Sequence, residues 1–445
     1  MRMNRIFSNL KTIMFSAVVA LPAVWQQATA AEHYVGGDIS LLPEYEEAGA
    51  QYKTHDGQPI ADLLPWLSEQ GMNAMRVRLF VNPEDYTEAD ADPNACQTMD
   101  YILPLCQRIK QQGMALMLDF HYSDTWADPA KQWTPKAWEN LTDDELYAKI
   151  YDYTRESLAT LKAAGVTPDF IQTGNEISYG MLWGRPGDKP ADLKKTFAGS
   201  DKNWERFATL LKQAIRACHE ECPEAKIVIH TERIKNRDEL KNFYQQMDRL
   251  GVEYDIIGLS YYPYFHGDMN VLDQALSMLE QNWPSKEIMI VETGYAYKWE
   301  VPGTTEKVDY PYSDAGQNEF AKALVTTLEH HPTVDGLFWW WLEYNAYGTS
   351  LSNWYNAPLF DSTTGRACSA LTTICSFGRS DSGIFSPVND AIGGTRRIFD
   401  IQGRPVSRPR AGELYIIDGH AGSNLVGCYI EEILTNLLAG ITLNV

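Results

Sequence analysis

The stretch Asp169-Phe-Ile-Gln-Thr-Gly-Asn-Glu-Ile-Ser-Tyr-Gly-Met-Leu-Trp183 has the form of a short buried strand that ends in polar residues. Its apolar start brings Asn175 and Glu176 to the end of the expected strand. A helix-length segment precedes it, and aromatic and glycine residues follow. The stretch Ile288-Met-Ile-Val-Glu-Thr-Gly294 repeats this pattern with Glu292. Two carboxylates, each at the C-terminal end of a buried strand, suit the hydrolysis of a glycosidic bond.

Short apolar segments alternate with amphipathic helices about eight times along the chain. The expected strands are Tyr34–Ile39, Ala74–Phe80, Ala115–Phe120, Phe170–Thr173, Ile227–His230, Ile256–Ser260, Ile288–Val291 and Leu337–Trp341. The main expected helices are Ile60–Gln70, Asp100–Gln112, Asp143–Ala164, Asn203–Glu220, Asp238–Leu250, Met269–Asn282 and Ala315–His330. This alternation predicts an α/β fold of the (β/α)8 TIM-barrel class, with the active site at the C-terminal ends of the strands. A doubly wound sheet is the alternative, but no Gly-rich phosphate-binding sequence follows the first strand.

The ends of the chain differ in composition from the barrel region, and we divide the sequence into four parts. A basic start, an uncharged apolar run and Ala28-Thr-Ala30 predict a signal peptide over residues 1–30, and hence export to the periplasm, cell surface or medium. A membrane anchor is the alternative, but the apolar run is short for a span. The catalytic (β/α)8 domain is expected over 31–377 and a Gly/Ser/Asp-rich linker over 378–394. Residues 395–445 are predicted to form a small β-rich tail of unknown role.

Composition restricts the partners. The formal net charge of −21 argues against nucleic acid or an anionic membrane surface, and favours a neutral polysaccharide. No membrane span is expected after removal of the signal peptide. Aromatic residues make up 12% of the chain, and many fall in the predicted loops, where flat rings can stack on sugars. The seven cysteines show no metal-site spacing with histidine, so we expect packing with one or two loop disulfides.

Glu176 and Glu292 are the candidate catalytic residues. Strands four and seven of a barrel face one another across part of its mouth, so both carboxylates can reach one bond. A retaining glycosidase holds its two carboxyl groups about 5–5.5 Å apart, one as acid/base and the other as nucleophile. We assign the acid/base role to Glu176 and the nucleophile to Glu292. Asn175 is expected to donate a hydrogen bond to the sugar 2-hydroxyl.

At these residues the chain resembles the clan A glycoside hydrolases, and it is most similar to the arabinogalactan endo-β-1,4-galactanases of glycoside hydrolase family 53. The resemblance covers residues 34–371 and is carried by Gly37–Ser40, Gly71–Leu79, Leu118–Pro129, Gln172–Ile177, Gly180–Trp183, Asp255–Pro263, Val291–Tyr295, Trp354 and Leu359–Asp361. It implies hydrolysis of β-1,4-linked galactose chains, the neutral side chains of pectin and type I arabinogalactan. It also places the acid/base on Glu176 and the nucleophile on Glu292.

The sequence departs from the family pattern after the eighth strand. Trp340-Trp341-Leu342-Glu343 stands where the family usually has Trp-Glu-Pro, which bears on the sugar contacts there. Some bacterial members hold a structural calcium between the last two loops. Here the candidate oxygen donors are Asp309, Asp314, Ser352 and Asp361. No cofactor is required by the predicted chemistry, and we expect a monomer.

The remaining candidate site residues are predicted to bind substrate or support the carboxylates: Arg76, Arg78, His121, Trp126, Trp133, Trp183, Tyr261, Tyr262 and Trp341. Arg76 and Arg78 share one strand face, so one of them is expected to reach Glu292 and keep it ionised. One of Tyr261 and Tyr262 is expected to hydrogen-bond the nucleophile. Each of these residues has a structural alternative, since a buried arginine, a satisfied histidine or a core tryptophan gives the same pattern.

Two other functions remain open from the residues alone. The same barrel and mechanism could serve another β-glycan, such as mannan, xylan or β-1,3-galactan. A non-catalytic glycan-binding surface protein is the alternative from a different class, although the presence of both glutamates argues against it. A metal-dependent hydrolase is disfavoured, because the nine histidines form no His-x-His or His-Glu-x-x-His motif.

Overall fold

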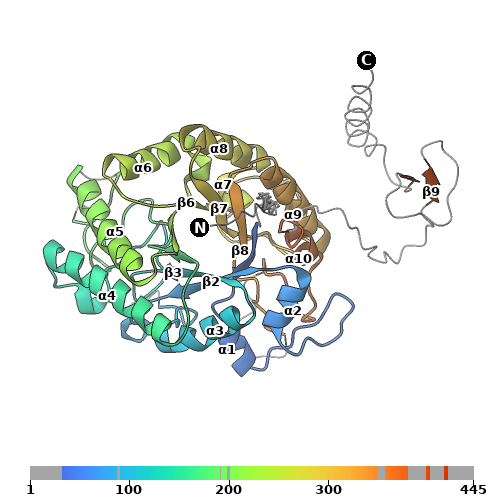
Figure 1. The fold of residues 1–445 in the computed structure, drawn as a ribbon, viewed down its shortest axis with the longest axis horizontal. Helices are drawn as coiled ribbons and strands as arrows, with labels where there is room; N and C mark the ends of the chain where they lie inside the picture. The colour runs from blue at the N-terminus through green and yellow to red at the C-terminus, as the bar shows by residue number, and fades with distance from the viewer. Residues whose placement is uncertain are drawn as a thin grey trace, which may run out of the picture. The chain divides into compact units, whose positions relative to one another are not determined.

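A computed structural model describes residues 33–87, 91–190, 192–197, 201–347 and 356–378, together with the backbone of 397–400 and 415–418. Eight parallel strands in sequence order close into a barrel surrounded by helices, which confirms the predicted (β/α)8 fold (Figure 1). The strands are β1 Tyr34–Asp38, β2 Ala74–Leu79, β3 Ala115–Phe120, β4 Phe170–Gln172, β5 Lys226–Thr231, β6 Ile256–Tyr261, β7 Glu287–Thr293 and β8 Val334–Trp339.

The helices begin where side chains can satisfy their first backbone N–H groups. Asp62, Thr98, Asn236, Asp268 and Ser313 each accept such a bond, and Thr142 forms a full capping box with Glu145. The helices are α1 Leu42–Glu47, α2 Leu63–Gln70, α3 Met99–Gln111, α4 Asp143–Ala163, α5 Asp201–Glu221, α6 Arg237–Arg249, α7 Pro263–His266, α8 Met269–Asn282, α9 Asp314–Glu329 and α10 Ser369–Ile374. Short 3-10 turns lie at η1 Pro83–Asp85, η2 Lys136–Trp138 and η3 Arg233–Lys235.

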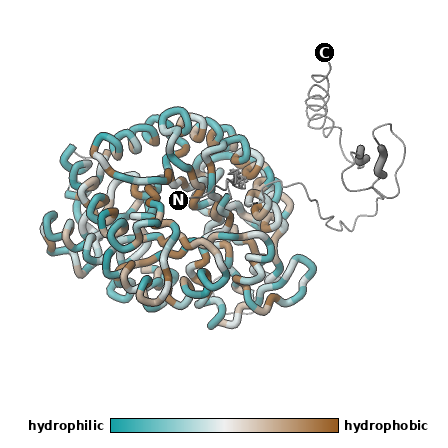
Figure 2. The backbone as a smooth tube through the Cα atoms, viewed as in Figure 1, coloured by the Kyte–Doolittle hydropathy of each residue, from teal (hydrophilic) through white to brown (hydrophobic). Residues whose placement is uncertain are grey.

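The barrel interior changes from apolar to polar along its axis. Phe170, Val228 and Ile256 belong to a buried apolar cluster inside the strands. Two residues further along β4 and β5, on the same strand faces, the side chains become Gln172 and His230. A larger apolar cluster joins the outer strand faces to the helices, whose outward residues are hydrophilic (Figure 2). The apolar layer closes the bottom of the barrel, so the polar groups collect at its C-terminal mouth.

The end of β8 and the pairing of β7 differ from the predictions in ways that affect the site. β8 ends at Trp339, so Trp340 and Trp341 lie in the turn that follows, and Trp341 has a positive φ of 51°. In β7 the pairing with β6 shifts between Leu259 and Ser260, a bulge that sets Ser260 opposite Glu292. Val291 packs in the inner apolar cluster, and the bulge lets the next residue, Glu292, also face the barrel mouth.

The second unit, Asp381–Val445, is described only at one hairpin. β9 Arg397–Asp400 and β10 Tyr415–Asp418 pair antiparallel. The predicted signal peptide and nearly all of the predicted linker lie outside the described residues. Within the described part, no helix is long and apolar enough to cross a membrane.

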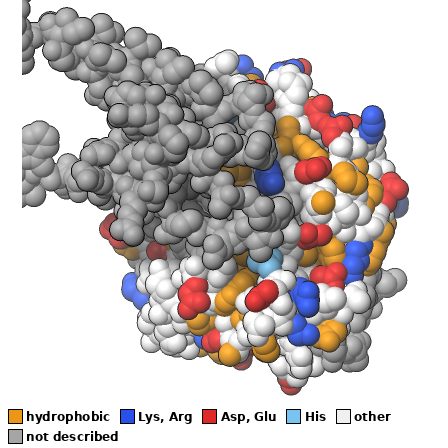
Figure 3. All heavy atoms as spheres, turned by 90° about the vertical axis from the view of Figure 1, so that its right-hand side faces the viewer, with side chains coloured by type: hydrophobic (Ala, Val, Ile, Leu, Met, Phe, Trp, Pro, Cys, Tyr) orange, Lys and Arg blue, Asp and Glu red, His pale blue; other side chains and the backbone are white. Residues whose placement is uncertain are grey.

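No disulfide joins any two of the six cysteines that the structure describes, so the expected loop disulfides do not form among them. Cys218 and Cys222 lie at the end of α5 and just beyond it, where helical geometry suits a bridge poorly. The surface is mixed in character: on the visible part of the face in Figure 3, acidic and basic side chains are interspersed with apolar ones.

Candidate active site

Glu176 lies on the turn that follows β4, and the backbone there is unusual. Gly174 has a φ of 116°, and Glu176 itself has a φ of 46°, a conformation that non-glycine residues rarely adopt. The turn is tied to β5, because the Ile177 amide donates to the His230 carbonyl at 3.0 Å. Strained residues of this kind persist where surrounding contacts hold them, and they cluster at functional sites.

Glu292 is held from two sides. Arg76 Nη2 lies 2.9 Å from its Oε1, and the Tyr262 hydroxyl donates to its Oε2 at 3.2 Å. The glutamate is 5% exposed. Burial raises the pKa of Glu292 to about 7, while Arg76 and the Tyr262 hydrogen bond hold that pKa down. Both contacts stabilise the ionised form of Glu292, and they match the expectation that one arginine and one tyrosine reach it.

Arg76 also connects Glu292 to the rest of the barrel mouth. Its Nη1 lies 3.0 Å from Asp38 Oδ2, and its Nη2 lies 2.8 Å from Asp119 Oδ2. Nη2 further donates to Asn175 Oδ1 at 2.7 Å, and the Asn175 amide nitrogen donates to the Ala127 carbonyl at 2.7 Å. Asn175 is therefore fixed in orientation by the same guanidinium that holds Glu292.

Glu176 has a different environment. Ser260 donates a hydrogen bond of 2.7 Å to Glu176 Oε1, and no arginine or lysine pairs with the carboxyl among the described residues. Burial, then the charge of Glu292, then that of Glu232 raise the pKa of Glu176 well above its usual range, with Ser260 lowering it in part. Arg76 thus favours the ionised form of Glu292, whereas Glu176 has no such cationic partner among the described residues. The pair thus offers one carboxylate and one carboxylic acid at the same time.

Three partly exposed rings line the mouth near these groups: Trp126, Tyr262 and Trp340. The rings of Trp126 and Trp340 lie 5.9 Å apart in an edge-on contact. The Arg78 guanidinium lies over both, 4.5 Å from the Trp126 centroid and 4.9 Å from that of Trp340. Trp340 also lies 5.7 Å from the Arg76 guanidinium, so it is the tryptophan placed beside the Glu292 cluster.

Several predicted substrate contacts are wrong in this structure because the side chains are buried. Tyr261 is 0% exposed, and its hydroxyl donates to the Gly267 carbonyl. Trp183 and Trp341 are 1% and 2% exposed, so neither offers a ring face to a sugar. Trp183 instead donates to the Tyr179 carbonyl. Trp341 was predicted for a strand end, but β8 stops earlier and the turn directs Trp340 toward the groove.

The other predicted residues support the site or border it. Arg76 and Arg78 are fully buried, so they position neighbouring groups and do not meet solvent or substrate. His121 is also buried: its Nε2 lies 3.0 Å from Asp119 Oδ2, and its Nδ1 accepts from the Ala127 amide. Trp133 is partly exposed and packs edge-on against Trp183, with ring centroids 6.1 Å apart. Of the predicted rings, Trp126, Trp133 and Tyr262 remain open to a ligand.

Polar residues that the sequence reasoning missed complete the site: Asp38, Asp119, Gln172, His230, Glu232 and Ser260. The alternation of inward and outward residues along a strand could have identified some of these residues. Asp119 falls on the same face as the inward Met117, and Ser260 stands two residues before Tyr262 in sequence. Their partners come from other strands, so their contacts cannot be derived from local sequence.

The candidate calcium donors do not form a site in the described part of the chain, where no group of three His, Cys, Asp or Glu side chains could hold a metal. Asp314 accepts from the backbone and hydroxyl of Ser369. Asp361 pairs with Lys298 at 2.9 Å and accepts from the Thr364 amide. Asp309 joins no such cluster, and Ser352 lies outside the described residues.

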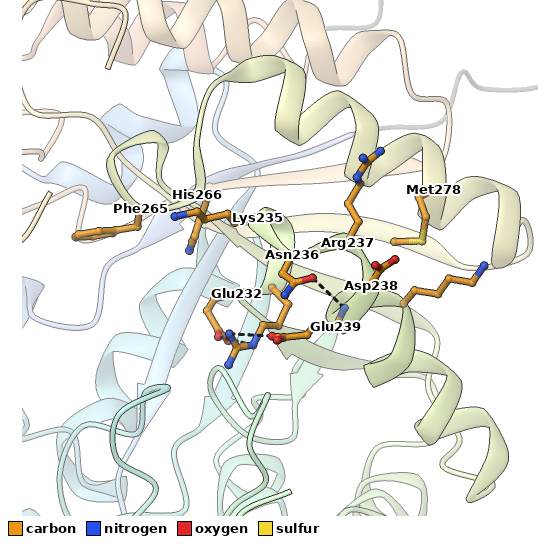
Figure 4. Close-up of a pocket in the computed structure, with 11 residues that line it drawn as sticks. Glu232, Lys235, Asn236, Arg237, Asp238, Glu239, Phe265, His266 and Met278 are labelled. Atoms are coloured by element: carbon orange, nitrogen blue, oxygen red, sulfur yellow. Dashed lines mark hydrogen bonds and ion pairs between the residues drawn. The ribbon is translucent and has the colours of Figure 1, made fainter. Parts of the chain in front are cut away.

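The surface also has a depression of about 810 Å³. It is lined by Glu232, which directly precedes η3, by charged side chains of η3 and α6 such as Lys235 and Glu239, and by Phe265 and His266 of α7 (Figure 4). Glu232 lines the depression and also raises the pKa of Glu176. Its charged lining suits hydrogen bonds to hydroxyl groups.

A TIM barrel with paired glutamates at the ends of its fourth and seventh strands defines a glycoside hydrolase. The chain belongs to glycosyl hydrolase family 53, whose sequence profile matches residues 34–374. It is 31% identical to the arabinogalactan endo-β-1,4-galactanase of Cellvibrio japonicus over 79% of this chain and 93% of that protein. It is also 31% identical to arabinogalactan endo-β-1,4-galactanase A of Aspergillus niger, over 75% of this chain and 92% of that protein.

A solved structure gives the same result. The family 53 catalytic domain of Ignisphaera aggregans superposes with a TM-score of 0.67 at 31% identity, covering 78% of this chain and 97% of that domain. The likeness therefore spans the whole barrel and both candidate glutamates. The protein is an enzyme of the glycoside hydrolase class.

Proposed function

We propose that the protein is a retaining endo-hydrolase of β-1,4-galactosidic bonds in type I (arabino)galactan, with Glu176 as acid/base and Glu292 as nucleophile. The observation that carries the assignment is the unequal environment of the two carboxyl groups. Glu292 has the Arg76 guanidinium and the Tyr262 hydroxyl, which favour its ionised form. Glu176 has a single hydrogen bond from Ser260 and the negative charge of Glu292 nearby, which favour its protonated form.

The reaction then runs in two displacements. Glu292 attacks the anomeric carbon with an oxygen lone pair, while Glu176 gives its proton to the departing glycosidic oxygen, which takes the bonding electron pair. Water attacks the resulting glycosyl ester, gives its proton to Glu176 and frees Glu292. The first step removes the proton from Glu176 and the second returns a proton from water, so the starting state is restored without a cofactor.

Asn175 and the open rings complete the sugar site. The amide of Asn175 stands beside both glutamates, and a hydrogen bond from such a group to the 2-hydroxyl strengthens in the transition state. Trp126 and Trp340 provide the apolar face against which a pyranose ring can stack. The substrate class rests on the two relatives named as arabinogalactan endo-β-1,4-galactanases, and on a net charge of −21, which suits a neutral chain. We propose export and action as a monomer on the basis of the N-terminal residues 1–30 and the soluble polymer substrate.

The test of substrate is the release of reducing ends from purified β-1,4-galactan compared with mannan, xylan and β-1,3-galactan. Preference for β-1,4-galactan by at least ten-fold in kcat/KM is the expected result. Release from another polymer alone would replace the substrate but keep the mechanism. Binding to galactan without any release would favour a glycan-binding protein instead.

The test of the residue roles uses Glu176→Ala and Glu292→Gln. We expect Glu176→Ala to lose about 10²–10⁴-fold in activity on galactan, which is the usual contribution of a general acid. The loss of activity should be smaller on an aryl galactoside with an activated leaving group. Azide should restore turnover of that aryl substrate and give a β-galactosyl azide. Glu292→Gln should be inactive on both substrates. An α-anomer as the first product by NMR would contradict retention.

A further inference from the structure

A chain of buried hydrogen bonds runs behind Glu176 and ends on one of its two oxygens. Gln172 Nε2 lies 3.0 Å from His230 Nδ1, and His230 Nε2 lies 2.8 Å from Ser260 Oγ. Ser260 Oγ lies 2.7 Å from Glu176 Oε1. Gln172, His230 and Ser260 are all 0% exposed, so water does not compete for these bonds. The chain links β4, β5 and β6 below the carboxyl group.

The direction of each bond follows from its donors. The backbone amide of Glu176 can only donate, and it points at His230 Nδ1 at 3.2 Å. The Gln172 amide nitrogen donates to the same atom, because that nitrogen also faces Asp119 Oδ1 at 2.7 Å and an oxygen there would be repelled. Nδ1 therefore carries no proton, and the neutral ring carries its proton on Nε2.

His230 stays neutral across the working pH range. Burial lowers its pKa well below the usual value, as do the charges of Arg76 and His121, while the charge of Asp119 acts in the opposite direction. Nε2–H thus donates to Ser260 Oγ, and the hydroxyl proton of Ser260 is directed at Glu176 Oε1. The hydrogen bonds share one direction along the chain, from His230 to the carboxyl group.

We propose that Ser260 and His230 are positioning residues that keep Oε1 of Glu176 as an acceptor, so that Oε2 is the oxygen that carries and delivers the catalytic proton. The inference rests on the proposed acid/base role of Glu176. An acceptor already engaged by Ser260 is a poor place for a proton, since the hydroxyl would then have to turn away and lose its partner. The same bond serves both half-reactions, because Ser260 donates whether Glu176 is protonated or ionised.

The chain also affects the pH at which Glu176 stops acting as an acid. Burial raises the pKa of Glu176, as do the charges of Glu292, Glu232 and Asp128, and the Ser260 hydrogen bond opposes them by favouring the ionised form. Removal of that bond raises the pKa of Glu176 further. The alkaline limb of the kcat/KM profile, where the acid is lost, therefore moves to higher pH in a variant without the hydroxyl.

The experiment compares Ser260→Ala with Ser260→Thr and with the wild-type enzyme. For Ser260→Ala we expect a loss of about 10–100-fold in kcat/KM on galactan, whose leaving group needs the proton, and less than three-fold on an activated aryl galactoside. The alkaline limb should move to higher pH. Ser260→Thr keeps the hydroxyl and should recover most of the galactan activity. The matched control is Thr154→Val, which removes a buried hydroxyl of α4 that is bonded to Tyr122. It should leave kcat/KM on both substrates unchanged.

His230→Gln tests whether the two residues act together. The glutamine can keep an N–H near Ser260 but loses the acceptor for the Glu176 amide. We therefore expect His230→Gln to lower kcat/KM on galactan, and we expect the double variant with Ser260→Ala to lose less than the sum of the two single effects. Equal losses on the two substrates, an unmoved alkaline limb or additive effects would overturn the proposal. If Glu176→Ala itself shows no azide rescue, the acid/base assignment fails first, and the two failures are thereby distinguished.

Discussion

Arg76 Nη2 lies 2.9 Å from Glu292 Oε1, although the two residues come from β2 and β7. The same nitrogen contacts Asp119 and Asn175, so a single guanidinium holds the carboxylate of Glu292 and the amide of Asn175. Arg76 is fully buried, and its charge is balanced by Asp38, Asp119 and Glu292. The reaction centre is therefore held from inside the barrel by a residue of β2.

Arg76→Lys should impair catalysis even though the substitution keeps the positive charge. A lysine keeps the charge but cannot place separate N–H groups on Asp38, Asp119, Asn175 and Glu292 together. We expect a loss of about 10²–10³-fold in kcat on galactan, comparable to the removal of one fixed donor from an active site. Since Arg76 lowers the pKa of Glu292, the acid limb of the profile should move to higher pH.

The matched control is Arg108→Lys, an exposed arginine of α3 that pairs with Glu46 and Asp62 away from the barrel mouth. It should leave the profile unchanged and cost less than about 1 kcal/mol in unfolding free energy. An Arg76→Lys enzyme with wild-type kcat and an unmoved acid limb would show that the ion pair does not tune Glu292.

The pH dependence of kcat/KM should be bell-shaped with its maximum above neutral pH. Glu292 must be ionised to attack, and its pKa is raised to about 7, so activity rises as the pH passes through about 7. Glu176 must be protonated, and its pKa is raised further by burial and by Glu292, so activity falls only at higher pH. The two limbs belong to the coupled pair and not to either residue alone. A profile with its maximum below pH 5, measured with galactan below KM, would contradict this arrangement.

The sequence was sufficient for the barrel because each strand is a short apolar run bounded by a glycine or polar turn. It also placed Glu176 correctly, since the residues after a parallel strand lie at the mouth of a barrel. Strand alternation in β2 also led to the expectation that one of Arg76 and Arg78 reaches Glu292, and in the structure it is Arg76.

What the sequence could not show depends on register and on distant contacts. The bulge opposite Ser260 allows both Val291 and Glu292 to face inward, which strict alternation forbids. The early end of β8 exchanges the roles of Trp340 and Trp341, and a one-residue difference in a strand end is enough to bury the wrong ring. The link from His230 to Ser260 joins residues 30 positions apart, and no local pattern predicts it.

Glu343→Gln should stabilise the protein at alkaline pH. The Glu343 carboxyl is fully buried, accepts from the Leu41 amide, and has a pKa raised to about 8 by burial and by Asp38. Its folded pKa lies above the unfolded value, so its contribution is fully present below about pH 4.5 and is lost as the pH rises toward 8. Over this pH range the unfolding free energy of the wild-type protein should therefore fall by a few kcal/mol, at most about 1.4 kcal/mol per pH unit. The variant should not show this fall.

Thermal or urea unfolding at pH 5 and pH 8 measures this difference. Glu69→Gln, at an exposed position on α2, is the control and should follow the wild type at both values. A Glu343→Gln protein that loses as much stability as the wild type between pH 5 and 8 would show that Glu343 ionises freely in the folded state.

Replacement of Trp340 and Trp183 should separate sugar binding from packing. Trp340 is partly exposed beside Arg76 and Trp126, whereas Trp183 is 1% exposed and bonded to the Tyr179 carbonyl. Full burial of a large apolar side chain against a ligand contributes about 1.5–3 kcal/mol, so Trp340→Ala should lower kcat/KM on galactan by about 10–100-fold with little change in Tm. Trp340→Phe should keep part of that activity.

Trp183→Phe should instead lower Tm while the kinetic constants of the folded enzyme change little, because the indole N–H loses its acceptor and a core volume is left unfilled. Substrate kinetics and thermal unfolding on the same two preparations decide the matter. If Trp183→Phe raised KM with an unchanged Tm, its ring would have to reach the sugar, and the side chain would then need to leave its place against Trp133 and Lys195. If Trp340→Ala lowered Tm but left kcat/KM unchanged, Trp340 would not belong to the proposed stacking surface.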